Sequence, residues 1–331
     1  MKVTFSLVIA LFLSPALFAQ GFQSAHFEIS QLSDGVYAAI HKPGGYGICN
    51  AGIVNLGRET LVFDCCLSPE AARDLKRAAE TLTGNPVKYV VNSHYHNDHV
   101  RGNQVFPDAR IIATRRTREL MEQLAAAEVE DEKKYVDQQI ADFTNNMARE
   151  EDSTKMTEHK LWLGYYQSMK SSHADYHVTL PDYLVDDSTS LKGKKRSVQL
   201  ICKGSGHSES DMIMWLPAEK ILFAGDLLFI GFHPWFGEAD IPGWLSYLNY
   251  MKNLGPATVI PGHGRTGAVA DLDEMSGYLI SIEAILAEMV RNKIPANLIG
   301  AIHVPEKYNA LYFRNFFTPG LTLQYQKKIR K

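Results

Sequence analysis

The sequence predicts an α/β protein, built as a four-layer αββα sandwich with a helical insertion. Two observations lead to this fold class. Strand-like runs bounded by turn residues occur early in the chain and return in its second half, and helical patterns follow several of these runs. Strands that alternate with helices in this way favour two stacked sheets with helices on the outside.

The early strand-like runs cover residues 36–41, 51–56 and 59–64, with Gly57 and Arg58 predicting a hairpin between the last two. The helix expected next begins after Ser68, which can cap it, and Pro69 suits the first helical position. Gly84 and Pro86 predict its end. The apolar run at residues 87–92 then predicts a buried strand.

Residues 115–177 form a segment of different composition, with no proline, a single glycine and many charges. Its apolar residues recur at alternating four- and three-residue steps, as at Val136, Ile140, Phe143 and Met147. This spacing predicts two or more amphipathic helices. Such an insertion can be ordinary solvated packing, a lid or a surface for homo-oligomer formation, and we favour packing.

Strand-like runs return after the insertion, and helical patterns follow the later ones. The strands are expected at residues 197–202, 211–217, 220–226 and 257–264, and the helices at 243–253 and 271–292.

Residues 1–21 have the pattern of a secretory signal peptide. Lys2 is followed by an apolar run that is short for a membrane span, and small residues lie near Ala19 and Gly21. We therefore expect an exported, periplasmic or secreted protein with no stable membrane anchor, whose single domain covers residues 22–331. The formal net charge of −3 does not favour nucleic acid as a partner.

Four cysteines are too few for a disulfide scaffold, and no C-x-x-C pair is present to form a zinc clip. If the register of the predicted hairpin continues, Cys49 lies opposite Cys66, at a separation that a disulfide spans. The alternative is that all four cysteines are free and buried.

The stretch "NSHYHNDHVRGN" places His94, His96, Asp98 and His99 within six residues, directly after the apolar run at 87–92. Burying these side chains together is unfavourable unless a cation binds them. The sequence therefore predicts a metal site at the end of this strand.

Three later strand signals each end in a ligand-type residue beside glycine: His207 in "GSGHSESD", Asp226 in "FAGDLLF" and His263 in "PGHG". With the first cluster, they give five histidines and two carboxylates. This number is too large for one tetrahedral zinc ion, and it suits two ions that share a carboxylate.

The ordered motifs H-x-H-x-D-H, G-x-G-H, G-D and P-G-H-G resemble those of the metallo-β-lactamase fold superfamily. The resemblance covers nearly all of the chain beyond the leader except the insertion. It implies that His94, His96 and His207 hold one metal ion and that Asp98, His99 and His263 hold a second. Asp226 would bridge the two ions, which we expect to be Zn²⁺, with iron or manganese also compatible.

Two departures from the best-known zinc β-lactamases affect the expected substrate. Those enzymes have cysteine at the position of Asp226, and a lysine that binds the substrate carboxylate where this chain has Phe229. The bridging aspartate is similar to the thioesterase, lactonase and nuclease branches. We therefore expect a hydrolase of a small ester, lactone, thioester or amide, with a true β-lactamase or a non-catalytic metal- or ligand-binding protein as alternatives.

In the expected mechanism, a metal-bound hydroxide attacks the carbonyl carbon and Asp98 carries a proton. Tyr95, Trp235 and Phe236 are candidate pocket walls. His233 is the one further histidine with a possible pocket role, and we treat the others, among them His41, as structural or surface residues.

Overall fold

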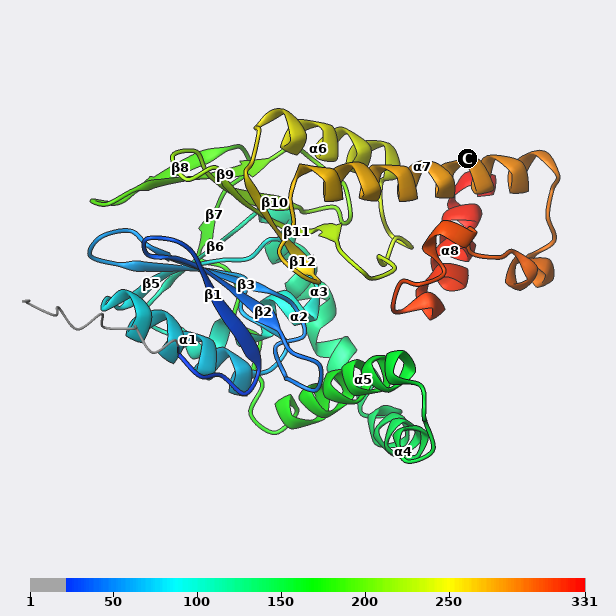
Figure 1. Cartoon of the computed structure of the whole chain (residues 1–331), viewed down its shortest axis with the longest axis horizontal. Helices are drawn as coiled ribbons and strands as arrows, with labels where there is room; N and C mark the ends of the chain where they lie inside the picture. The colour runs from blue at the N-terminus through cyan, green and yellow to red at the C-terminus, as the bar shows by residue number, and fades with distance from the viewer. Residues whose placement is uncertain (1–21, 331) are drawn as a thin grey trace, which may run out of the picture.

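The computed structural model describes residues 22–330 and has the predicted four layers (Figure 1). The predicted signal peptide lies outside these residues and stays a prediction. No helix within residues 22–330 combines the length and apolar character that crossing a bilayer requires.

The first sheet contains seven strands, which follow one another in chain order. Its first four strands pair antiparallel, and the next three add in parallel. Asn55 pairs with Thr60, so the predicted hairpin is confirmed. The strands are β1 (Phe27–Ser33), β2 (Val36–His41), β3 (Ala51–Asn55), β4 (Thr60–Phe63), β5 (Val87–Val91), β6 (Arg110–Ala113) and β7 (Tyr183–Leu184).

The second sheet contains five strands in the order β12-β11-β10-β9-β8. Its strands pair antiparallel except β11 and β12, which run parallel and lie at one edge. The strands are β8 (Thr189–Lys192), β9 (Ser197–Cys202), β10 (Met212–Leu216), β11 (Ile221–Phe229) and β12 (Thr258–His263).

The two sheets pack face to face through an apolar core. Phe63 of the first sheet and Phe223 of the second lie with their ring centroids 5.8 Å apart, among buried aliphatic side chains from both sheets. Because neighbouring residues of these strands point alternately into this core and toward the outer helices, the strands read as nearly continuous apolar runs.

Helix α1 (Pro69–Thr83) covers the outer face of the first sheet with its alanine- and leucine-rich side. It begins as predicted, since the Ser68 hydroxyl accepts a hydrogen bond from the Ala71 backbone N–H at 3.1 Å, and it ends at Gly84 in the left-handed conformation. Helices α6 (Ile241–Asn253) and α7 (Val269–Arg291) cover the second sheet.

The insertion forms three helices that project beyond the sandwich: α3 (Arg115–Glu132), α4 (Val136–Met147) and α5 (Ser153–Ser172). The packing interpretation is supported by an apolar cluster in which Val136 and Met169 meet Ile48 and Leu67 of the sandwich. Helix α5 also faces the cavity described below, so packing is only part of its role.

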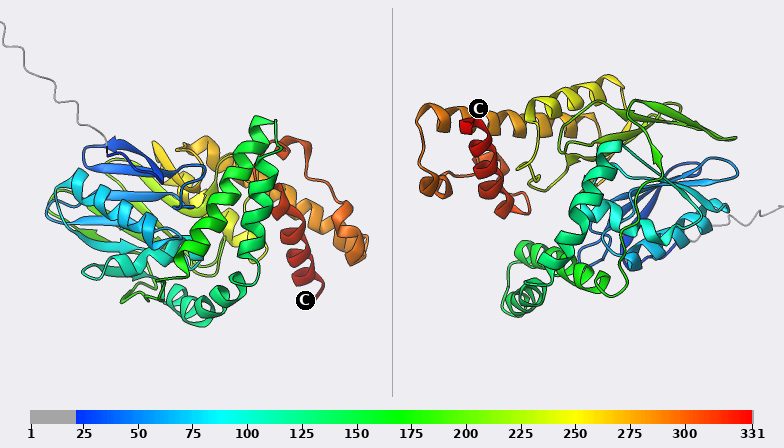
Figure 2. Two further views of the ribbon diagram at one scale, coloured as in Figure 1. Left: turned by 90° about the horizontal axis from the view of Figure 1, so that it is seen from below. Right: turned by 180° about the vertical axis from the view of Figure 1, so that it is seen from behind.

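The C-terminal segment contains elements that the sequence pattern does not predict. Three short 3₁₀ turns, Ala296–Ala301, Glu306–Tyr308 and Arg314–Phe316, lead to α8 (Phe317–Arg330). Figure 2 shows this segment folding back beside the insertion. The Gln324 amide fixes α8 by donating to the carbonyl oxygens of Phe236 and Ala239 at 2.6 and 2.9 Å.

Of the two alternatives for the cysteines, the Cys49–Cys66 disulfide is wrong: all four cysteines are free, and all but the half-buried Cys202 are buried. The hairpin ladder ends at the pair Gly52–Phe63. Beyond it Asp64 and Cys66 take left-handed backbone conformations, with φ of 57° and 76°, and so does Ile48 at 69°. These turns break the register from which the pairing was inferred.

A buried ion pair ties the insertion to the sandwich. Arg101, just after the histidine cluster, binds Glu132 at the end of α3 through two hydrogen bonds of 2.9 and 2.5 Å. The Glu132 carboxylate also contacts Asn97 at 3.3 Å and His173 at 3.0 Å. The side chains of Arg101 and Glu132 are only 1% and 4% exposed.

We expect Glu132→Ala to lower the free energy of unfolding by about 3–5 kcal/mol, because it leaves a buried guanidinium without its partner. The matched control is Asp131→Ala, at the position next to Glu132. It removes the exposed ion pair with Lys134 and should lower the free energy of unfolding by less than about 1 kcal/mol. Urea unfolding followed by circular dichroism measures both. Equal losses in the two variants would show that the Arg101–Glu132 pair does not hold the insertion in place.

Candidate metal centre and cavity

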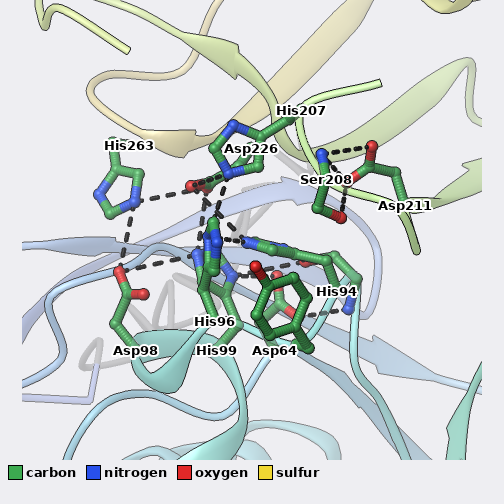
Figure 3. Close-up of polar contacts among 12 residues, drawn as sticks. Asp64, His94, His96, Asp98, His99, His207, Ser208, Asp211, Asp226 and His263 are labelled. Atoms are coloured by element: carbon green, nitrogen blue, oxygen red, sulfur yellow. Dashed lines mark hydrogen bonds and ion pairs between the residues drawn. The ribbon is translucent and has the colours of Figure 1, made fainter. Parts of the chain in front are cut away.

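The ligand-type side chains converge because they lie at the ends of neighbouring strands. His94 and His96 follow β5, and α2 (Asn97–Val100) carries Asp98 and His99. His207 lies in the loop between β9 and β10, whereas Asp226 is within β11 and His263 ends β12. Figure 3 shows the seven side chains pointing toward a common centre.

The first group consists of His94, His96, His207 and Asp226. The Nδ1 atom of His96 lies 2.9 Å from His94 Nε2 and 3.1 Å from His207 Nε2. The Asp226 Oδ2 atom lies 3.9 Å from His94 Nε2 and 3.5 Å from His207 Nε2.

The second group consists of Asp98, His99 and His263. The Asp98 Oδ2 atom lies 3.7 Å from His99 Nε2 and 3.4 Å from His263 Nε2. The other oxygen of Asp226, Oδ1, lies 3.1 Å from His99 Nε2 and 3.4 Å from His263 Nε2. Asp226 therefore turns one carboxylate oxygen toward each group.

This arrangement fits metal ions better than it fits hydrogen bonding. Three imidazole nitrogens meet at the first group, although a neutral imidazole carries only one N–H. Within residues 22–330, His99 Nε2 and Asp226 Oδ1 are buried and lie 3.1 Å apart as an ion pair, but neither atom makes a hydrogen bond of acceptable geometry. Imidazole nitrogens and carboxylate oxygens are ligands of zinc and related divalent ions. The residues present therefore fit two such ions.

Burial lowers the pKa of His207 to about 3 and the pKa of His94 well below its ordinary value. Both side chains are therefore neutral near pH 7, as ligands must be. At His96, the third histidine of the first group, neighbouring carboxylates outweigh burial and raise the pKa. Burial alone would raise the pKa of Asp226, but His263 and His99 outweigh it and hold this pKa well below the usual range.

Two ligand-type histidines, His94 and His99, are oriented by contacts of the ring nitrogen that does not face the ligand groups. His94 Nδ1 lies 2.9 Å from the Ser93 hydroxyl, and His99 Nδ1 lies 2.8 Å from the buried carboxylate of Asp64. The other Asp64 oxygen accepts from the Ser93 backbone N–H at 2.7 Å. Such contacts fix the orientation and tautomer of metal-binding histidines.

Sequence reasoning missed Asp64, although its position at the end of a buried strand was a usable signal. Its left-handed backbone conformation, at φ 57°, is uncommon for a residue other than glycine and turns the carboxylate away from the ladder.

A close backbone approach explains one glycine of "PGHG". A Cβ on Gly262 would collide with Asp226 Oδ1 and with the backbone of β11. Glycine at this position thus lets β12 bring His263 beside Asp226.

The metal centre lies at the floor of a cavity of about 930 Å³. Its wall includes Asp98, Asp226 and His263, together with residues of the insertion and of the C-terminal segment. Much of the rest is aromatic: Tyr95, Tyr135, Trp162, Tyr165, Tyr166, Phe229, Phe232, Trp235, Tyr312, Phe313 and Phe316.

The residues that line the cavity can be compared with those predicted to do so. Tyr95 and Trp235 line it as predicted, whereas Phe236 is fully buried in the core of the second sheet. His233 is also buried, and its Nδ1 lies 2.9 Å from the Tyr278 hydroxyl. His41, which we expected to be structural or at the surface, lines the cavity instead.

Sequence reasoning also missed Glu238 at the edge of the centre. Its Oε2 accepts a hydrogen bond from the Tyr95 hydroxyl at 2.9 Å and lies 3.6 Å from His96 Nε2. The neighbouring His96 ring lowers the pKa of Glu238 to about 2.

The fold and the site together define an αββα protein with paired metal-binding groups. Residues 44–263 match the family model of the metallo-beta-lactamase superfamily. This match covers well over half of the chain, and the chain belongs to that superfamily.

Two curated relatives show how far the similarity extends. The chain is 31% identical to "Metallo-beta-lactamase type 2" of Bacteroides fragilis over 95 residues, which are 27% of this chain and 38% of the relative. It is 23% identical to "Beta-lactamase-like protein 2 homolog" of Caenorhabditis elegans over 246 residues, 71% of this chain and 63% of the relative. The matches thus span less than two thirds of either relative.

Solved structures share the fold. A metallo-beta-lactamase from Pontibacter korlensis superposes with a TM-score of 0.56 at 17% identity, covering 76% of this chain and 98% of that one. A structure of VMB-1 gives a TM-score of 0.55 at 19% identity, covering 78% and 99%. At these identities the likeness supports the fold class only.

We expect Asp226→Ala to reduce the number of tightly bound metal ions from two per chain to at most one, because each group loses the oxygen of the shared carboxylate that faces it. Changing a residue that merely orients a ligand typically costs 10–100-fold in metal affinity or activity, so loss of the ligand itself should lower hydrolysis by more than about 100-fold. Elemental analysis of the dialysed protein measures the ions.

The matched control is Glu128→Gln, which alters a carboxylate of the cavity wall that pairs with Arg101 and should retain two ions. Two tightly bound ions in Asp226→Ala, with native circular dichroism, would contradict the bridging position of Asp226.

Proposed function

We propose that the protein is a metal-dependent hydrolase with two divalent ions, zinc foremost, that cleaves an ester, lactone, thioester or amide at its carbonyl carbon. One observation carries the proposal: the two oxygens of Asp226 face two separate groups of ligand-type side chains on the floor of a cavity. Superfamily membership supports the same reaction class.

We assign His94, His96 and His207 to one ion, Asp98, His99 and His263 to the other, and Asp226 to both. Two ions so held would lower the pKa of a bound water and polarise the substrate carbonyl. Asp64 and Ser93 keep the histidine rings oriented. Asp98 exposes part of its carboxylate to the cavity, which suits it to take and return a proton beside the substrate.

The local similarity to a relative named metallo-beta-lactamase keeps hydrolysis of β-lactams as the second candidate. Two features of the cavity disfavour it. Phe229 stacks on His263, with centroids 5.1 Å apart, where the resemblance called for a lysine. Arg265 lines the cavity but binds the Asp271 carboxylate at 2.7 Å and the Thr266 carbonyl at 2.9 Å.

We expect the zinc-loaded protein to hydrolyse benzylpenicillin with a kcat/KM at least about tenfold below that for an uncharged lactone, because the penicillin carboxylate finds no free cationic side chain. Phe229→Lys should raise the penicillin-to-lactone ratio, and Phe229→Met, which adds no charge, should not. Initial rates with both substrates measure the ratio.

A kcat/KM for benzylpenicillin of about 10⁵ M⁻¹s⁻¹ or more, above that for the lactone, would make the β-lactamase assignment correct instead. No turnover of any carbonyl substrate by the metal-loaded protein would favour the non-catalytic binding protein.

A further inference from the structure

A continuous run of aromatic rings lies along the wall of the cavity. This aromatic band consists of Trp162, Phe232, Trp235, Phe313 and Phe316. Trp162 lies 4.5 Å from Phe313 and 5.6 Å from Phe316, measured between ring centroids. Phe316 continues to Trp235 at 5.7 Å, and Phe313 continues to Phe232 at 5.2 Å.

The aromatic band joins three segments that are distant in sequence: α5, the loop after β11 and the C-terminal segment. A polar contact reinforces the junction, because the Phe313 backbone N–H donates to Glu158 Oε1 at 3.0 Å. Phe313 holds a left-handed conformation at φ 62°, which is unfavourable for a bulky side chain. Strained backbone of this kind persists where surrounding contacts hold it, commonly at ligand sites.

The charged side chains around the cavity disfavour an anionic group on the aromatic band. Glu128 and Glu238 add negative charge to the wall near Tyr95. Arg265 is the only lysine or arginine among the described residues that line the cavity, and Asp271 already neutralises it. An anionic group lying on the aromatic band would therefore meet no free cationic side chain.

The size of the cavity indicates a bulky ligand. Its volume of about 930 Å³ is near the upper end for sites that take drug-sized molecules. A short acyl group would leave the half-buried rings of the aromatic band in contact with water, whereas an aryl or long alkyl group would cover them and the accessible edge of Trp162.

We propose that the substrate is an uncharged carbonyl compound bearing an aryl or long alkyl group, which lies on the aromatic band while its carbonyl reaches the metal centre. This inference rests on the proposed hydrolase. In the reaction, the bond from the carbonyl carbon to the leaving oxygen, sulfur or nitrogen breaks. Water supplies OH to that carbon and a proton to the leaving group.

The first test uses ethyl esters of increasing acyl length, from acetate to octanoate, and ethyl 4-phenylbutanoate. For the metal-loaded full chain, kcat/KM should rise at least about tenfold from acetate to the two bulky esters. Trp162→Ala should reduce that ratio about tenfold, and Trp162→Phe should restore most of it.

The matched control is Phe143→Ala. Phe143 of α4 stacks on Trp162 at 6.1 Å but is not among the residues that line the cavity. Its variant should keep the ratio within about threefold, which separates contact with the substrate from support of α5.

The second test needs no turnover. Isothermal titration of the metal-loaded protein compares 4-phenyl-2-butanone, an uncharged ketone, with 4-(3-oxobutyl)benzenesulfonate, the same ketone with a negative charge on its ring and a weak metal ligand. The uncharged ketone should bind more tightly, and Trp162→Ala should weaken its binding about tenfold while Phe143→Ala should not.

The possible failures are distinguishable. Three results would overturn the substrate class alone. They are ester hydrolysis with a flat acyl series, tighter binding of the ring sulfonate than of the uncharged ketone, and ketone binding that is insensitive to Trp162→Ala. Ketone binding that depends on Trp162, without hydrolysis of any ester, lactone, thioester or amide, would overturn the proposed hydrolase on which the substrate class rests.

Discussion

The central constraint on the structure is an electrostatic problem. Ligand-type side chains from β11 and from the ends of β5 and β12 meet in one place. Five imidazoles and two carboxylates lie within a few ångströms, four of the seven side chains are buried, and three imidazole nitrogens converge on one point. Cations that neutralise Asp98 and Asp226 and accept the nitrogen lone pairs resolve this problem. Features of the sandwich around the centre serve it, including the strained turn at Asp64 and the glycine at 262 that lets β12 approach β11.

Sequence patterns predicted much of the sandwich because its signals are local. The Ser68 cap, Pro69 and Gly84 define α1 through contacts within a few residues, and the hairpin register follows from Gly57 and Arg58. The seven ligand-type residues were found because each follows or ends a predicted strand. The structure brings them together, although β11 continues past Asp226 to Phe229. Their roles as metal ligands stay predictions. The Cys49–Cys66 pairing failed because it extended a local register across left-handed turns that the pattern does not reveal.

The features that the sequence did not reveal depend on contacts between distant segments. Trp162 reads as one apolar residue of an amphipathic helix, and Phe313 lies in a stretch without strong periodicity. Only tertiary packing places their rings 4.5 Å apart above the metal centre. The Arg101–Glu132 pair likewise joins the histidine cluster to the end of α3 across 31 residues. The helices of the insertion, for which the sequence analysis favoured a packing role, thereby also form part of the cavity wall.

The position of the metal ions tests the central claim most directly. A crystal structure of the zinc-loaded protein, with anomalous scattering collected at the zinc edge, would locate each ion. We predict two peaks about 3.5–4 Å apart, with one oxygen of Asp226 on each, the first beside His94, His96 and His207 and the second beside Asp98, His99 and His263. A single peak in the fully loaded protein, or two peaks without Asp226 between them, would contradict the account.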